Sequence, residues 1–197
     1  MKIFLDTADV STILNHFETG LIDGVTTNPT LIRKSGRDPE EVYQELAEEG
    51  VRDISMEVVG DSETMTSEGL RLAAKFQEVA TIKVPCSPDG LLTCAHLSRD
   101  NIKVNVTLIF DAAQAILAAK AGATYVSPFV GRLDDNSVNG LDVIKDIHDI
   151  YQTHWVKTQI LSASIRGVKA VSTSFALGAH VVTMPPSVFE KMYNHVL

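Results

Sequence analysis

The sequence predicts an α/β fold in which eight parallel strands close into a single (β/α)8 barrel. Short β-rich runs alternate with helix-like segments along the whole chain, and there are eight such runs. Strands that alternate with helices run parallel with right-handed crossovers, in an open doubly wound sheet or a closed barrel. The chain has no GxGxxG turn after its first run and no GxxxxGK[ST] motif, so the barrel is favoured.

The expected strands can be read in chain order. They are KIFLD (2–6), DGVTTN (23–28), DISMEVV (53–59), ATIKVPC (80–86), KVNVTLI (103–109), TYVSPFV (124–130), KTQILSAS (157–164) and HVVTMP (180–185). We find no linker, repeat or low-complexity segment between them. Residues 1–197 are therefore expected to form one domain.

The segments between the strands carry helix start and stop signals. Asp38, Ser87 and Asp111 each precede a helix-like run and are expected N-caps. Residues able to adopt positive φ are common just after helices. Four glycines stand at such positions: Gly20, Gly50, Gly122 and Gly178.

The charge and composition of the chain indicate which binding partners and which cellular location to expect. The formal net charge is −8 and there is no basic stripe, so we expect no nucleic-acid binding. No apolar run approaches the roughly 20 residues that cross a bilayer, and the acidic residues of MKIFLDTADV are atypical of a signal peptide. Cys86 and Cys94 are too few for a disulfide framework. We therefore expect a cytoplasmic location and no membrane contact.

The histidines do not form a metal-binding pattern. None of the six belongs to an HExxH, HxH or similar group of ligands, and the cysteines have no CxxC spacing. We therefore expect neither a metal site nor another cofactor.

Polar residues near the ends of the expected strands stand out, because strands buried on both faces are normally apolar. They include Asp6, Asn28, Glu57, Lys83 and Ser164. Alternate side chains of a strand share a face, which pairs Asn105 with Thr107 and Ser127 with Phe129. Active sites of (β/α)8 barrels form at the carboxyl ends of the strands, so these residues are the expected site.

Lys83 is the most informative of these residues. It stands between Ile82 and Val84, a poor place for a lysine that only solubilises a surface. Buried lysines carry the neutral amine more readily than exposed ones, and this amine can attack a carbonyl to form an imine. The alternative is a frayed strand from which Lys83 reaches solvent.

Imine chemistry requires proton transfer, for which Asp6, Glu57 and the hydroxyl of Thr107 are candidates. Asp6 has a structural alternative as the cap of a helix that begins near Thr7. Glu57 lies between apolar residues in a core strand, so it needs either a role or a salt-bridge partner.

Two arginines follow the sixth and seventh expected strands. Arg132 and Arg166 are predicted in loops at one rim, where they could hold a phosphate together with the hydroxyl of Ser164. The alternative is two ordinary surface arginines. Asn28, in TTNP, is either a site residue or a turn residue before Pro29.

With these residues assembled, the chain resembles the small transaldolase family, which includes fructose-6-phosphate aldolases. The matching stretches cover essentially the whole chain in order: FLDTAD, GVTTNPTLI, IKVPCSPDGL, KVNVTLIF, AGATYVSPFVGRLDD and LSASIR. The resemblance implies a TIM barrel without metal or organic cofactor. It also implies a transferase that moves a dihydroxyacetone unit between sugar phosphates of the pentose phosphate pathway.

The resemblance also implies a role for each site residue. Lys83 matches the lysine that forms the Schiff base, Asp6 the acid/base of carbon–carbon cleavage, and Glu57 with Thr107 a pair that acts through water. The remaining residues match positions that bind the substrate. Asn28 and Asn105 match hydrogen-bonding partners of the bound donor, and Ser127 matches a residue that lines the pocket. The phosphate-binding positions are matched by Arg132, Ser164 and Arg166.

Three positions separate the two branches of the family. In the aldolase branch the positions of Glu57 and Phe129 are typically Gln and Tyr, and the position of Asn105 is apolar. Here all three resemble the transaldolase branch, so transaldolase is the expected activity and fructose-6-phosphate aldolase the alternative.

The resemblance further implies a homo-oligomer. Family members usually continue with another C-terminal helix, and on this comparison the chain is expected to lack it. Two other functions stay open. A barrel that only binds sugar phosphates is disfavoured by Lys83, Asp6 and Glu57, and other isomerase or lyase chemistry would not require a lysine within a strand.

Overall fold

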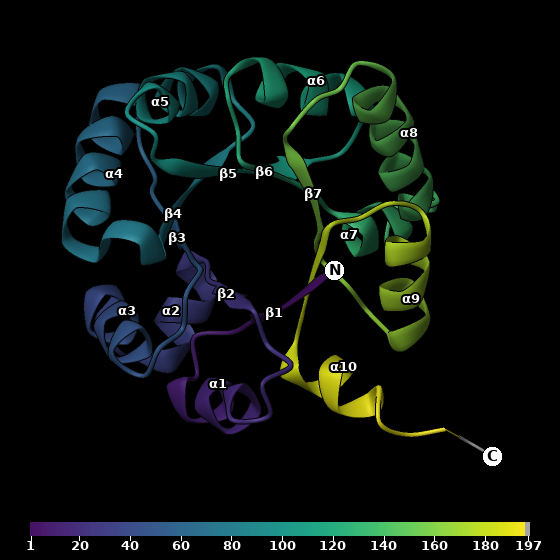
Figure 1. Ribbon diagram of the computed structural model, residues 1–197, viewed down its shortest axis with the longest axis horizontal. Coiled ribbons are helices and arrows are strands. Elements are labelled where there is room, and N and C mark those ends of the chain that lie inside the picture. The colour runs from purple at the N-terminus through teal and green to yellow at the C-terminus, as the bar shows by residue number, and fades with distance from the viewer. Residues whose placement is uncertain (196–197) are drawn as a thin grey trace.

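The computed structural model describes residues 1–195 and is a closed barrel of eight parallel strands in the order β1 to β8. Figure 1 shows the strands as an inner ring with the helices around it. The predicted fold class is therefore confirmed. The (β/α)8 arrangement brings the carboxyl ends of all strands to one end of the barrel, where the polar residues of the sequence are concentrated.

The eight strands are found in the predicted order. They are β1 (Lys2–Asp6), β2 (Gly24–Thr26), β3 (Ile54–Glu57), β4 (Ala80–Pro85), β5 (Lys103–Ile109), β6 (Tyr125–Pro128), β7 (Gln159–Ser162) and β8 (Val181–Met184). The barrel closes where β1 pairs with β8, with Leu5 opposite Met184. The register also places Glu57 and Asn105 on either side of Lys83.

Helices link successive strands. They are α1 (Val10–Phe17), α2 (Pro29–Ser35), α3 (Pro39–Glu48), α4 (Ser62–Phe76), η1 (Gln77–Val79), α5 (Pro88–Arg99), α6 (Ala112–Lys120), α7 (Val130–Asp134), α8 (Gly140–Thr153), α9 (Val168–Ala176) and α10 (Pro186–Lys191). The side chains of Asp38, Ser87 and Asp111 accept backbone hydrogen bonds at the N-termini of α3, α5 and α6, so these predicted caps are confirmed. None of the helices in residues 1–195 is long and apolar enough to cross a membrane.

The sixth strand is shorter than the sequence predicts. It ends at Pro128, and the short helix α7 begins at Val130. Proline has no N–H to donate to a neighbouring strand, and only a single bridge, between Phe129 and Ala163, continues the pairing. The prediction of a strand through Val130 was therefore wrong at this end. Arg132, predicted in a loop, lies in α7.

The apolar core has two parts. The larger cluster lies between the strands and the helices, and the smaller one comprises Phe4, Tyr125, Leu161, Ala163 and Val181. The smaller cluster contacts the partly buried ring of Phe129. It lies inside the barrel, because its residues alternate with side chains of the larger cluster along each strand.

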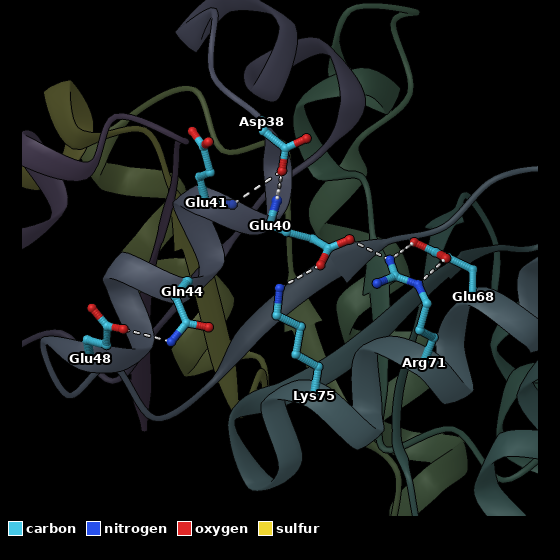
Figure 2. A network of polar contacts seen from close by, with 8 residues as sticks. All are labelled: Asp38, Glu40, Glu41, Gln44, Glu48, Glu68, Arg71 and Lys75. Atoms are coloured by element: carbon cyan, nitrogen blue, oxygen red, sulfur yellow. Dashed lines mark hydrogen bonds and ion pairs between the residues drawn. The ribbon is translucent and has the colours of Figure 1, made fainter.

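An ion-pair network joins α3 to α4 on the outside of the barrel. The Glu40 carboxylate contacts Arg71 Nη2 at 2.6 Å and Lys75 Nζ at 2.7 Å, and Arg71 also contacts Glu68 at 2.7 Å. Figure 2 shows Glu40 between the two cations. Both cations hold the pKa of Glu40 at about 2, below its ordinary value of 4.5.

Candidate active site

A cavity of about 200 Å3 opens at the carboxyl ends of the strands. Its lining is drawn from β1, β2, β4, β5, β6 and β8 and from the segments after β6, β7 and β8. The lining residues are Asp6, Thr26, Asn28, Lys83, Thr107, Ser127, Phe129, Arg132, Ala163, Ser164, Ile165, Arg166, Thr183 and Pro185. Nine of the eleven predicted site residues are among them; Glu57 and Asn105 are the exceptions.

Lys83 points into the barrel and is only 6% exposed, so a solvent-reaching lysine on a frayed strand is ruled out. Its Nζ lies 3.0 Å from Glu57 Oε2 and donates to the Thr27 carbonyl at 2.9 Å. The immediate surroundings of the amine are therefore polar, although its neighbours in sequence, Ile82 and Val84, are apolar. Glu57 does not line the cavity, but it contacts the lysine directly because the two residues are neighbours in register.

Asp6 closes β1 and does not cap a helix, since Asp9 is the N-cap of α1. Its Oδ1 accepts a hydrogen bond from Thr26 Oγ1 at 2.8 Å. Burial raises the pKa of the Asp6 carboxyl, and the charge of Lys83 and the Thr26 hydrogen bond oppose this rise. A carboxyl with a raised pKa beside an amine can both accept and return a proton.

Thr107 carries a buried hydroxyl that faces the cavity. Its Oγ1 has no hydrogen-bond partner among residues 1–195. The next residue, Leu108, has φ +59, and the pairing of β5 with β6 shifts register between Val106 and Ile109. Irregularities of this kind redirect side chains next to active sites. A hydroxyl without a partner in a polar cavity is well placed to bind a ligand or water.

Asn105 lies beneath the cavity instead of lining it. Its amide donates to Ser55 Oγ at 3.2 Å and accepts from Ser127 Oγ at 2.7 Å. Lys83 is its partner in the strand register. In this structure Asn105 therefore anchors Ser127, which does line the cavity.

The predicted phosphate residues come together at the rim. Arg132, from α7, and Arg166, from the segment after β7, both line the cavity with Ser164. Gly131 N donates to Ser164 O at 3.0 Å, which holds the two segments together. Ser164 has φ +59, an uncommon conformation for a serine and frequent at functional sites.

The remaining predicted residues have mixed roles. Asn28 accepts from Leu31 N at 3.0 Å as the N-cap of α2, so the turn interpretation is correct, yet it also lines the cavity. Phe129 lines the cavity and packs edge-to-face on Phe110, with ring centroids 5.9 Å apart.

Two hydroxyls of the cavity were not predicted from the sequence. Thr26 and Thr183 line the cavity beside Asp6, are 2% and 3% exposed, and contact each other at 2.7 Å. The signal was present, because each is a polar residue in an apolar strand, as were the residues that the analysis selected. The backbone carbonyl of Thr27, by contrast, carries no signal in a sequence.

A larger groove of about 840 Å3 lies at the opposite end of the barrel, between α6 and α8. It contains Lys120, His154 and Lys157 but no carboxylate, and its lining is mainly apolar. Within residues 1–195 there is also no group of three or more His, Cys, Asp or Glu side chains that could hold a metal ion. The cavity at the carboxyl ends contains nine of the predicted site residues and is therefore the candidate active site.

The sequence model of the family described as transaldolase/fructose-6-phosphate aldolase matches residues 3–197. Proteins named probable transaldolase are similar to the whole chain: 50% identical over 198 residues in Ruegeria pomeroyi and 52% over 200 residues in Erythrobacter litoralis. The chain covers 91% of each of these proteins.

Among solved structures, an L230A mutant of flavocytochrome b2 with benzoylformate has a similar fold. The TM-score is 0.62 at 13% identity, over 85% of this chain and 50% of that chain. Identity this low indicates a shared fold only. The family match and the full-length relatives show more: the chain is an enzyme of the transaldolase/fructose-6-phosphate aldolase family.

Proposed function

We propose that this enzyme is a transaldolase that transfers a dihydroxyacetone unit from a ketose phosphate to an aldose phosphate through a Schiff base on Lys83. The observation that carries the proposal is a buried lysine that contacts a carboxylate inside a polar cavity with two arginines at its rim. The substrates are sugar phosphates, and the reaction belongs to the pentose phosphate pathway.

Lys83 is the nucleophile and Glu57 takes its proton. The two groups are 3.0 Å apart, within hydrogen-bond distance, so the proton can pass directly. The neutral amine attacks the C2 carbonyl of the donor, and the oxygen leaves as water once Glu57 returns the proton. Thr107, whose hydroxyl has no partner in the described chain, binds this water.

Asp6 carries out the carbon–carbon step. Its carboxylate takes the proton of the C4 hydroxyl, the C3–C4 bond breaks, and the electron pair moves into the imine to give an enamine and a free aldose phosphate. The enamine then attacks the aldehyde of the acceptor, and Asp6 returns the proton to the new hydroxyl. The raised pKa of Asp6 suits a group that must do both.

Arg132, Ser164 and Arg166 bind the phosphate. The arginines offer planar sets of N–H donors that match phosphate oxygens, and Ser164 adds a hydroxyl. Arg166 is held by Asp135 at 2.7 Å in the free protein, and Arg132 lies 5.9 Å from the Phe129 ring centroid. Asn28 and Ser127 contribute polar groups to the donor end of the cavity.

The aldolase branch is the alternative. Phe129 offers no hydroxyl to protonate the enamine, which therefore persists until an acceptor arrives. Asn105 supports Ser127 from below through a 2.7 Å hydrogen bond that an apolar residue would not make. Both features favour transfer over release of free dihydroxyacetone.

The test mixes the protein with fructose 6-phosphate, with and without erythrose 4-phosphate. Formation of glyceraldehyde 3-phosphate and sedoheptulose 7-phosphate only with the acceptor supports transaldolase. Acceptor-independent release of dihydroxyacetone indicates aldolase, and no turnover leaves a barrel that only binds sugar phosphates. Borohydride trapping with fructose 6-phosphate should add the donor fragment to Lys83.

The control compares two lysine substitutions. Lys83→Met should abolish trapping and turnover, whereas Lys120→Met, at an exposed lysine of α6, should retain both. Trapping that persists in Lys83→Met would contradict the assigned nucleophile.

A further inference from the structure

We infer that Thr183 and Thr26 form a directed chain of hydroxyls that holds Asp6 so that only its Oδ2 exchanges a proton with the substrate. The two threonines would then be positioning residues of the reaction, acting through Asp6. The inference rests on the proposed function for its catalytic meaning, although its structural part does not.

The direction of the chain follows from counting protons. A threonine hydroxyl has one proton to donate. Thr26 Oγ1 donates it to Asp6 Oδ1 at 2.8 Å, so the 2.7 Å contact between the two threonines requires Thr183 Oγ1 as the donor. Hydrogen bonds in such a series polarise one another, which strengthens the bond that reaches the carboxylate.

The two carboxyl oxygens of Asp6 differ in their hydrogen bonds. Oδ1 is occupied by Thr26, and no hydrogen bond from residues 1–195 reaches Oδ2. Because Thr26 can donate to Oδ1 whether Oδ2 carries a proton or not, the chain keeps its direction in both states of the carboxyl. Asp6 therefore gains and loses a proton without turning its side chain.

The threonines are well placed for this task. They belong to β2 and β8, the two strands that pair with β1, so they reach Asp6 from neighbouring strands. Both are almost completely buried, which keeps water from competing for their hydrogen bonds. Lys83 from β4, which is ion-paired with Glu57, acts electrostatically on the Asp6 carboxyl, and Arg132 and Arg166 line the same cavity.

The experiment removes each hydroxyl while keeping the side-chain shape. Thr26→Val should lower kcat for fructose 6-phosphate with erythrose 4-phosphate about tenfold, with little change in KM, since acid–base catalysis contributes about 10²–10⁴-fold. The acidic limb of the pH–kcat profile should move to higher pH, because the carboxylate loses a hydrogen bond that favours it. Thr183→Val should lower kcat and move the acidic limb in the same directions but by less. Thr26→Ser keeps the hydroxyl and should show the kcat and acidic limb of the unchanged enzyme.

Thr81→Val is the matched control. Thr81 is a buried threonine that also donates to an aspartate, Asp53 Oδ1, at 2.7 Å. Thr81 is near the start of β4 and Asp53 directly precedes β3, so both lie at the end of the barrel opposite the candidate site. Losing this hydroxyl should lower the unfolding temperature without moving the acidic limb. If Thr26→Val behaves in the same way, its role is merely structural and the inference is wrong.

A second readout does not depend on turnover. The carboxyl carbon of Asp6 can be titrated by ¹³C NMR in the substrate-free protein, with its signal assigned from the Asp6→Asn variant. The pKa of Asp6 should be higher in Thr26→Val than in the unchanged protein and unchanged in Thr26→Ser. An equal pKa in all three overturns the inference, whereas failure of the unchanged protein to transfer dihydroxyacetone overturns only the proposed function.

Discussion

At the scale of single residues, Phe129 decides what happens to the enamine under the proposed mechanism. Its ring lines the cavity and rests against the edge of Phe110. Phe129→Tyr adds one phenol at the cavity, which can protonate the enamine. We expect the ratio of free dihydroxyacetone to sedoheptulose 7-phosphate to rise, measured by quantifying both products from fructose 6-phosphate and erythrose 4-phosphate.

Phe110→Tyr provides the matched control, because this ring does not line the cavity. It should leave the product ratio as it was. An unchanged ratio in Phe129→Tyr would show that the ring position does not govern the fate of the enamine.

At the scale of elements, α7 and the segment after β7 approach each other closely at Gly131 and Ser164, whose backbones are hydrogen-bonded at 3.0 Å. A Cβ on Gly131 would lie 2.0 Å from the Ser164 carbonyl oxygen and 2.8 Å from Arg166 Cγ. Gly131→Ala must therefore separate the segments that carry the three proposed phosphate ligands. We expect KM for fructose 6-phosphate to rise about tenfold or more, since charged hydrogen bonds contribute about 1.5–3 kcal/mol each.

Gly167→Ala tests whether the effect is specific. Gly167 follows Arg166, has φ −169, and has nothing within 4 Å of an added Cβ. The KM of Gly167→Ala for fructose 6-phosphate should stay close to that of the unchanged enzyme.

A second comparison uses unphosphorylated fructose as the donor. In Gly131→Ala, kcat/KM should fall much less for fructose than for fructose 6-phosphate. Equal losses for the two donors would argue against a phosphate site here.

The elements also explain what could be predicted from the sequence and what could not. Strand positions were readable because apolar runs and caps are local signals. The end of β6 was misplaced because Val130 is a good strand former that tertiary context puts at the start of a helix. Glu57 was expected to need a role or a salt-bridge partner, but its pairing with Lys83 was not predicted, since it depends on the register between β3 and β4.

The candidate site was predictable as a set of residues but not as a geometry. Polarity near strand ends, alternation along the strands and the two arginines that follow β6 and β7 selected nine residues that line the cavity. It could not show that Asn105 lies one layer below, nor that Thr26 and Thr183 meet, because closure of the barrel brings together residues from β2 and β8. Contacts of that kind depend on tertiary structure alone.

At the scale of the whole molecule, the ion pairs of Glu40 make the stability of the fold depend on pH and on salt concentration. Because Arg71 and Lys75 lower the pKa of Glu40 from 4.5 to about 2, its contribution is present above pH 4.5 and is lost as the pH falls toward 2. Glu40→Gln should therefore lower the urea midpoint at pH 7. The difference from the unchanged protein should shrink toward pH 2 and also in 1 M salt, where charges are screened.

Glu48→Gln is the control for the charge change alone. Glu48 lies on the same helix, and within residues 1–195 its side chain accepts a hydrogen bond only from Gln44, at 2.7 Å, so its loss should barely change the urea midpoint. Equal midpoints for the two variants at pH 7 would mean that the contacts between α3 and α4 add nothing to stability.

The pairing of β1 with β8 also has a consequence for the order of events during synthesis. During synthesis β1 precedes the other seven strands, and its partner β8, which carries Thr183, follows all of them. Until then β1 is an open edge that other chains can pair with. The carboxylate of Asp6 meets its full set of neighbours only when the barrel closes. A nascent chain should therefore contain Lys83, the proposed nucleophile, before Asp6 is in position to act with it.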